Sequence, residues 1–201
     1  MTAKQTASAP PPARRPAREA LLEAAARRFY AHGLTGTGID TITAEAGVAK
    51  KSLYNNFASK ADLVIAYLYA RHEEWLGLYR ARLERAATPK DRVLAVFDAY
   101  ADHADLAYEH GFRGCGLLNA AAELPAGDPG RAVVRRHKEE VEALLAGHLA
   151  EFLPDPAKQA APLAQHLAFL LEGAMVRAGL EGDDRCVLEA RGIAATLIGA
   201  P

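Results

Sequence analysis

The stretch IDTITAEAGVAKKSLYNNF, residues 39–57, decides the fold of the first part of the chain. It reads as two segments of about two helical turns each, joined by the tripeptide GVA. Gly47 in this tripeptide takes a left-handed backbone conformation at little cost, which allows a sharp turn. The apolar residues placed to pack the two helices together are Ile42, Ala46, Val48 and Leu53. The pattern predicts a helix-turn-helix unit.

The second of these helices leaves a set of polar side chains for its outer face. Lysine suits phosphate or guanine, asparagine suits adenine edges, and hydroxyl groups suit phosphate oxygens. Two lysines at a helix N-terminus oppose the helix dipole, which favours a polyanion partner over chance, although a solvated helix end is the alternative. The residues of this polar set are Lys50, Lys51, Ser52, Tyr54, Asn55 and Asn56.

The charge is unevenly distributed along the chain. The net charge is −1, but residues 1–60 carry nine Lys and Arg against four acidic residues, whereas the remainder carries 15 against 21. A basic head on an acidic body indicates that only the head meets a polyanion. Chance asymmetry combined with a basic tail is the alternative interpretation.

The composition favours helices. Half of the 201 residues are hydrophobic, Ala and Leu dominate, and runs of β-branched residues are scarce. No apolar stretch reaches the roughly 20 residues that a membrane helix needs, and the N-terminus lacks the apolar core of a signal peptide. The two cysteines, Cys115 and Cys186, lie far apart, which argues against a disulfide framework or a cysteine-based zinc site. We therefore expect a cytoplasmic protein.

The whole chain is expected to be all-α. Residues 1–16 predict a disordered tail, 17–60 a DNA-binding domain and 61–201 a helical ligand-binding and dimerisation domain. Thr37 is expected to cap the second helix and Ser59 the fourth. The nine expected helices cover about 17–33, 39–46, 50–57, 60–87, 91–109, 115–124, 131–152, 162–180 and 185–198.

The segment TGTGIDTITAEAGVAKKSLYNNFASKADLV, residues 35–64, resembles the DNA-binding head of TetR-family transcriptional regulators. The preceding LLEAAARRFYAHG resembles the first helix of that head. Thr41 and Thr43 depart mildly, since the family often has Asp and Ala there. The residues that carry the resemblance are Phe29, Gly33, Thr37, Ile39, Ile42, Ala46, Gly47, Val48, Leu53, Tyr54, Phe57, Ser59, Lys60 and Leu63.

The resemblance implies roles for individual residues of the head. Thr37, Tyr54 and Lys60 would contact phosphate. The residues that would reach base edges or adjacent phosphates are Lys50, Lys51, Ser52 and Asn56. It also implies a homodimer that pairs through its last two helices and reads a palindromic operator in double-stranded DNA.

The resemblance further implies a pocket for a small-molecule inducer among the middle helices. The candidate apolar walls are Trp75, Phe97, Tyr100, Leu118 and Phe169. The candidate polar points are Asn119, Glu123, His166 and Glu172, with Cys115 of interest as a sensor. For each residue, an ordinary core or surface position is the alternative.

We thus expect a repressor that a small molecule releases from its operator. A helical enzyme or small-molecule carrier with a vestigial head is the alternative, and a non-specific architectural DNA-binding protein is a third. No catalytic set, cofactor or metal site is predicted. The acidic residues Asp98, Asp102, Asp105 and Glu109 share one helical face near His103 and His110. They could hold a cation, but a solvated acidic face is the favoured interpretation.

Overall fold

The computed structural model describes residues 16–105 and 109–199. In these two ranges the chain forms helices and no strand, which confirms the predicted all-α fold. The predicted tail falls almost wholly outside the described residues, as do residues 106–108. The helices are α1 (Ala17–His32), α2 (Ile39–Glu45), α3 (Lys50–Asn56), α4 (Lys60–Leu83), α5 (Pro89–Ala104), α6 (Gly116–Glu123), α7 (Pro129–Ala150), α8 (Pro156–Glu181) and α9 (Arg185–Leu197).

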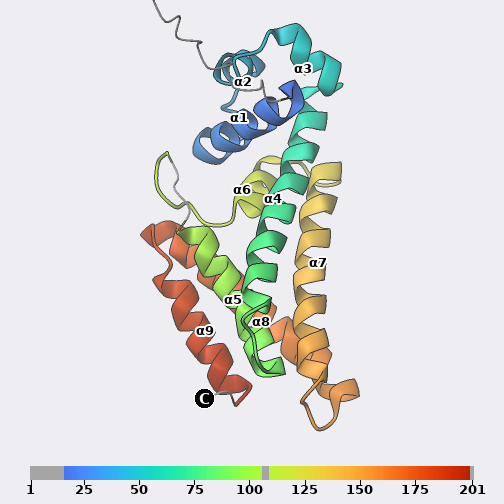
Figure 1. Cartoon of the computed structure of the whole chain (residues 1–201), viewed down its shortest axis with the longest axis vertical. Helices are drawn as coiled ribbons and strands as arrows, with labels where there is room; N and C mark the ends of the chain where they lie inside the picture. Colours follow the sequence, from blue (N-terminus) through green and yellow to red (C-terminus); the bar gives the residue numbers. More distant parts are fainter. Residues whose placement is uncertain (1–15, 106–108, 200–201) are drawn as a thin grey trace, which may run out of the picture.

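Helices α1, α2 and α3 form a small bundle at one end of the molecule, which we call the head, residues 17–60 (Figure 1). Helix α1 packs against both α2 and α3. Leu21, Ile42 and Leu53 have no exposed surface, and Phe57 is buried beside them. Burial of these side chains holds the three short helices together, because helices of this length are marginal alone.

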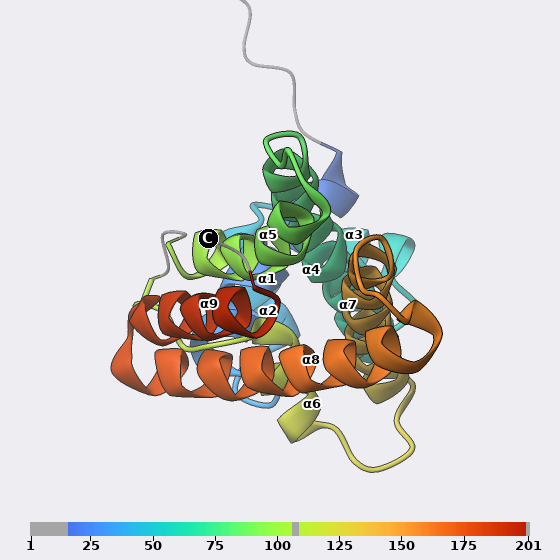
Figure 2. The ribbon, with the colours of Figure 1, turned by 90° about the horizontal axis from the view of Figure 1, so that it is seen from below.

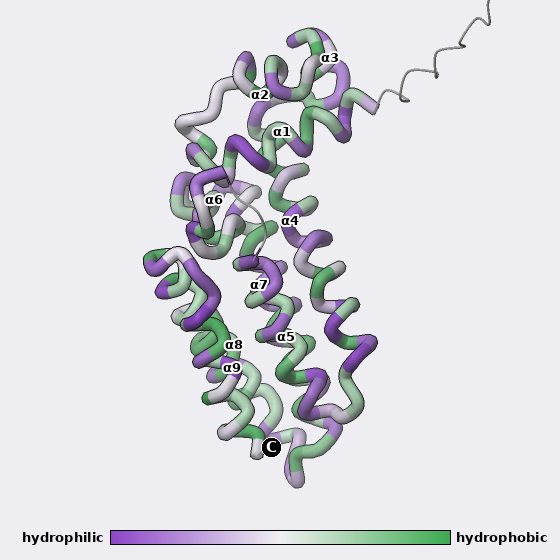
Figure 3. The backbone as a smooth tube through the Cα atoms, turned by 60° about the vertical axis from the view of Figure 1, so that its left-hand side comes forward, coloured by the Kyte–Doolittle hydropathy of each residue, from purple (hydrophilic) through white to green (hydrophobic). Residues whose placement is uncertain are grey.

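Helix α4 joins the head to the remaining helices, which we call the body, residues 61–199 (Figure 1). Ser59 caps α4 as predicted, since its hydroxyl accepts a hydrogen bond from the Asp62 N–H at 3.1 Å. In the body, α4 packs on α5 and α7, and α7 packs on α8. Helices α8 and α9 lie side by side on one side of the body (Figure 2). Hydrophobic and hydrophilic residues alternate along these helices, as amphipathic helices require (Figure 3).

Prolines begin three of the body helices, and this corrects the predicted boundaries. Helix α5 begins at Pro89 rather than at Asp91, because Thr88 and Asp91 form a capping box around that proline. Helix α7 begins at Pro129 rather than at Arg131, with the Asp128 carboxylate accepting from the Gly130 N–H at 2.7 Å. Helix α4 also ends at Leu83, earlier than expected, and α5 at Ala104.

Helix α8 begins at Pro156, so the predicted start at Pro162 is wrong. Pro162 lies inside the helix, where it cannot donate the usual hydrogen bond to the carbonyl four residues earlier. Ala160, Ala164 and Leu167 are buried along one side, before and after the proline. Their burial explains why the helix continues through Pro162 rather than starting there.

Candidate nucleic-acid interface and interior pocket

The turn between α2 and α3 has the predicted geometry. Gly47 has a φ angle of +64°, in the left-handed region that favours glycine. The Val48 N–H donates to the Thr43 carbonyl at 3.1 Å, which closes the end of α2. Leu53 and Phe57 then fix the inner side of α3 against the head core. The opposite side of α3 is left facing solvent.

Four exposed residues of α3 make up the surface that we call the α3 face: Lys50, Lys51, Tyr54 and Asn55. The Tyr54 side chain is 52% exposed, so its ring and hydroxyl are available to a partner. The Lys50 Nζ lies 2.8 Å from the Asp40 carboxylate, and this contact raises the pKa of Lys50. Sequence analysis assigned no role to Asn55, but its exposure beside Tyr54 adds it to the candidate interface.

Two residues predicted to touch bases are turned partly toward their own helix. Ser52 and Asn56 are half-buried. The Asn56 Nδ2 donates to the Ser52 carbonyl at 2.7 Å, near the C-terminal end of α3. Base contacts by these two residues therefore stay a prediction, and any such contact by Asn56 competes with this hydrogen bond.

Thr37 and Lys60 hold the loop that precedes α2. Thr37 is only 2% exposed, and its hydroxyl donates to the carbonyls of Gly33 at 2.8 Å and Arg28 at 3.1 Å. The predicted Thr37 cap is wrong, because Gly38 occupies the N-cap of α2 without a side-chain bond. Lys60 donates from Nζ to the Leu34 carbonyl at 2.6 Å. In this conformation neither side chain reaches outward, so their phosphate contacts remain unsupported by the geometry.

A small cavity lies inside the body, where α4, α5, α7 and the start of α6 meet. Its volume is about 10 Å³, enough for about one water molecule. Trp75 is 3% exposed, and its Nε1 is a buried donor with no partner among the described residues. An unpaired buried donor is costly, so this cavity favours a hydrogen-bond acceptor as its occupant. The lining residues are Arg71, Trp75, Tyr100, His103, Cys115, Gly116, Leu117 and His137.

Ionic side chains surround this cavity. The Lys138 Nζ lies 3.0 Å from the Glu172 carboxylate, 3.5 Å from the Tyr100 hydroxyl and 3.9 Å from the Cys115 Sγ. Burial opposes the charge on Lys138, but its contacts with Cys115, Tyr100 and Glu172 outweigh burial and raise its pKa. Arg71 pairs with Glu74 at 2.5 Å. The cavity wall is therefore rich in hydrogen-bond donors and cationic groups.

Two buried histidines in the same wall are neutral at physiological pH. Burial, aided by Arg71 and Lys138, lowers the pKa of His103 to about 3. Burial and Lys138 likewise lower the pKa of His137 to about 3. Arg71 and His137 are functional candidates that were not predicted from the sequence, although their helical spacing pointed to them. Each lies one helical turn from buried residues of its helix, so a polar side chain falls on an apolar face.

The predicted ligand-pocket residues separate into three groups. Trp75, Tyr100 and Cys115 line the interior cavity, and Glu172 reaches its edge through Lys138. Leu117 rather than Leu118 faces the cavity, and Phe97 is core. The residues that lie elsewhere are Asn119, which donates to the Arg113 carbonyl, Glu123, which contacts the head, and His166 and Phe169, which are exposed on α8. These four residues do not line the interior cavity, and their role in ligand binding stays a prediction.

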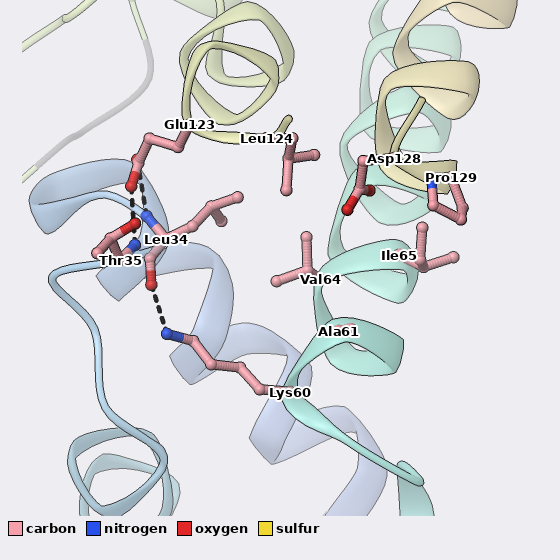
Figure 4. A pocket seen from close by; sticks show the side chains of 10 residues that line it. All are labelled: Leu34, Thr35, Lys60, Ala61, Val64, Ile65, Glu123, Leu124, Asp128 and Pro129. Carbon is pink, nitrogen blue, oxygen red and sulfur yellow. Dashed lines mark hydrogen bonds between the residues drawn. The ribbon is translucent and has the colours of Figure 1, made fainter. Parts of the chain in front are cut away.

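Helix α6 contacts the end of α1 on both sides. The Arg113 guanidinium, before α6, donates to the carbonyls of Tyr30 at 2.9 Å and Ala31 at 2.6 Å. Glu123, the last residue of α6, accepts from the N–H groups of Leu34 and Thr35 at 2.8 and 2.7 Å (Figure 4). A second cavity of about 270 Å³ opens beside Glu123, between the α1–α2 loop, α4 and the start of α7 (Figure 4). Sequence analysis gave no sign of these long-range contacts.

Helices α8 and α9 expose an apolar surface, which we call the α8–α9 face. Phe169 is 65% exposed and Leu180 is 78% exposed. A groove of about 470 Å³ runs between the two helices and is lined in part by Phe169, Cys186 and Ile193. Large apolar side chains exposed on two neighbouring helices favour a protein–protein contact there. The large residues of the face are Phe169, Val176, Leu180, Leu188, Ile193 and Leu197.

Comparisons with known proteins agree with this architecture. Residues 21–67 match the family model described as bacterial regulatory proteins, tetR family. The crystal structure of SCO4454, a TetR-family transcriptional regulator from Streptomyces coelicolor, is 33% identical, covers 90% of this chain and 93% of that chain, and has a TM-score of 0.78.

Two curated relatives match the first part of the chain. The HTH-type transcriptional activator FasR of Mycolicibacterium smegmatis is 32% identical over 98 residues, 49% of this chain and 43% of its own length. The HTH-type transcriptional repressor KstR2 of Mycobacterium tuberculosis is 35% identical over 79 residues, 39% of this chain and 40% of its own length. The chain thus spans about two fifths of the length of these curated relatives. The match over nearly the full length of SCO4454, joined to the head match, means that the chain belongs to the TetR family of bacterial regulatory proteins.

Proposed function

We propose that this protein is a sequence-specific DNA-binding transcriptional regulator whose α3 enters the major groove. The observation that carries the proposal is the α3 face, where Lys51, Tyr54 and Asn55 are exposed on a helix whose inner side is fully packed. Lysine and asparagine supply the donors that base edges and phosphates accept, and the Tyr54 hydroxyl suits phosphate. A regulator of this kind works beside the chromosome, so we place its action in the cytoplasm.

The protein is proposed to act as a homodimer through the α8–α9 face. A second copy would cover Phe169 and Leu180, whose exposure is costly for a chain that stays monomeric. A two-fold dimer presents two α3 helices to a palindromic operator, with half-sites about one DNA turn apart.

Release by a small molecule is proposed to begin at the interior cavity. The cavity has a volume of only about 10 Å³, so a ligand larger than water that accepts a hydrogen bond from Trp75 must push its wall apart. The wall includes Cys115 and Leu117, at the N-terminal end of α6. Because Arg113 and Glu123 tie the same helix segment to the end of α1, movement of α6 would reach the head. Two sites that share one movable element satisfy the requirement for coupling.

We propose repression as the mode of action, since a dimer bound over an operator blocks access to the DNA. Among the relatives, KstR2 is named a repressor and FasR an activator. A reporter gene under the selected operator distinguishes the two, because deletion of a repressor raises expression and deletion of an activator lowers it.

The test of DNA binding is competition between an operator and random DNA, repeated over a range of salt concentrations. A specific regulator keeps a large preference for operator at every salt concentration, while an architectural protein loses affinity for both DNAs in parallel. An enzyme or carrier with a vestigial head would show no shift with either DNA. The matched pair of variants is Lys51→Ala on the α3 face and Lys158→Ala on the body.

A further inference from the structure

Three side chains with metal-binding atoms meet on the surface where the head joins the body. His32 is the last residue of α1, and Glu109 and His110 lie between α5 and α6. One imidazole nitrogen from each histidine and one Glu109 oxygen lie within 4.8 Å of one another. Within residues 16–105 and 109–199, no other three such side chains come this close. All three are exposed, so an ion reaches them without any opening of the fold.

The ligand atoms of His32, Glu109 and His110 need only small side-chain rotations to surround an ion. The rings of His32 and His110 meet edge to face with centroids 5.2 Å apart, and the His110 Nε2 is 3.9 Å from the Glu109 Oε1. In a tetrahedral zinc site the ligand atoms are about 3.3 Å apart, because zinc–nitrogen distances are about 2.0–2.1 Å. Exposed side chains at a helix end have the freedom to close this difference.

A cationic group already contacts two of the three residues of this cluster. The Arg28 Nη1 lies 3.2 Å from the His32 Nε2 and 3.5 Å from the Glu109 Oε1. The Nε of the same guanidinium donates to Glu45, and this bond raises the pKa of Arg28. Arg28 therefore has a second anchor on α2 and stays bound in the head when its Nη1 is displaced.

We propose that His32, Glu109 and His110 bind a transition-metal ion of the zinc class, which replaces the Arg28 Nη1. Two imidazoles and one carboxylate suit Zn²⁺, Ni²⁺ or Co²⁺, with water at the open position, whereas Mg²⁺ and Ca²⁺ prefer oxygen ligands. The ion would join the C-terminal end of α1 to the segment that precedes α6. Two of the other acids on the same helical face are already paired, since Asp98 contacts Arg191 at 2.6 Å and Asp102 contacts Arg82 at 2.6 Å.

The experiment is a calorimetric titration of Zn²⁺ into the whole chain, purified without a histidine tag. A Cys186→Ser background removes the half-exposed thiol, a competing zinc ligand. One ion per chain is expected, with His32→Ala and His110→Ala each weakening binding tenfold or more. His166→Ala is the matched control, because His166 is equally exposed on α8, and it should leave the affinity unchanged. Circular dichroism confirms that each variant is folded.

Arg28→Gln is the sharpest variant, since removal of the competing charge should tighten zinc binding. Weaker binding in Arg28→Gln contradicts the central position given to the ion. Equal zinc affinity in wild type and both single variants, His32→Ala and His110→Ala, overturns the site, as does competition by equimolar Mg²⁺. Because the titration contains no DNA, its outcome is independent of the proposed regulatory function.

Discussion

The Glu123 carboxylate accepts a hydrogen bond from the Leu34 N–H at 2.8 Å, and so joins the last residue of α6 to the loop that follows α1. Its second oxygen accepts from Thr35 at 2.7 Å. Burial alone would raise the pKa of Glu123, but these backbone bonds and the nearby Lys60 lower it. The Glu123 carboxylate lies so close to Gly33 that a side chain there would clash, since an added Cβ would lie 2.5 Å from the carboxylate oxygen.

Glu123→Gln should lower the free energy of unfolding by about 1 kcal/mol, because one amide end cannot accept from the second N–H. The loss is small because Glu123 is exposed and solvent screens its charge. The ionised carboxylate stabilises the fold above its ordinary pKa of 4.5, so the difference between the two proteins should shrink as pH falls below that value. Urea unfolding measures both effects. Glu139→Gln, on an exposed surface ion pair, serves as the control, and an equal loss in both variants contradicts the role of Glu123.

The buried histidines should make the protein sensitive to acid. The pKa of His137 is lowered from 6.5 to about 3 by burial, Lys138 and His72, so the unfolded chain binds the proton more readily between these values. Stability therefore falls as pH drops below about 6.5, by about 1.4 kcal/mol per pH unit for this group. His137→Gln should remove about 2 kcal/mol of the loss between pH 7 and pH 5. His166→Gln should leave the slope unaltered, and a similar slope in His137→Gln and wild type would show that His137 is not held neutral.

The α8–α9 face should hold the dimer. Ile193→Glu would bury an unpaired charge from each copy in a two-fold apolar interface, so the variant should be monomeric at concentrations where the wild type is dimeric. Light scattering after size exclusion measures the mass, and operator affinity should fall by about tenfold or more. Tyr69→Glu is the control, since Tyr69 is also a large, exposed hydrophobic residue but lies on α4. A dimeric Ile193→Glu protein would place the interface elsewhere.

Two substitutions on the α3 face should have different effects on DNA binding. Tyr54→Phe removes a hydroxyl suited to phosphate, so affinity should fall by a similar factor for all sequences. Lys51→Ala removes a donor suited to guanine edges, so the preferred sequence should change at one position of each half-site, at a cost of about 1–3 kcal/mol. Binding curves on single-base variants of the operator measure both. A Tyr54→Phe protein with an altered base preference would mean that Tyr54 reads bases.

Local patterns explain what the sequence predicts well. The head follows from apolar spacing, Gly47 and the Ser59 cap, all set by residues within a few positions of one another. The helix boundaries failed at Pro89, Pro129 and Pro156, because a proline that ends one element also suits the first turn of the next. At Pro162, proline predicted the start of a helix. The buried residues on both sides of it, Ala160 and Ala164, keep the helix continuous instead.

Contacts between distant parts of the chain explain what the sequence does not predict. Glu123 is a polar residue on a mostly apolar helix, which predicted a place in a pocket. Its carboxylate instead accepts a hydrogen bond from the backbone of the α1–α2 loop, and no local sequence pattern connects that loop to Glu123. Arg113 likewise finds Tyr30 and Ala31 only through the packing of α6 on α1. The cluster of His32 with Glu109 depends on the same packing. Arg71 and His137, by contrast, are polar residues on the apolar faces of α4 and α7, so their place in the interior could have been predicted from helical spacing.

The central claim is that α3 reads a specific palindrome as part of a dimer. Selection of bound DNA from a random pool tests it most directly. The wild-type protein should enrich a palindrome whose half-site centres are about one DNA turn, roughly 34–36 Å, apart, and Lys51→Ala should enrich a different one. A pool that shows no enriched sequence after repeated selection would contradict the claim.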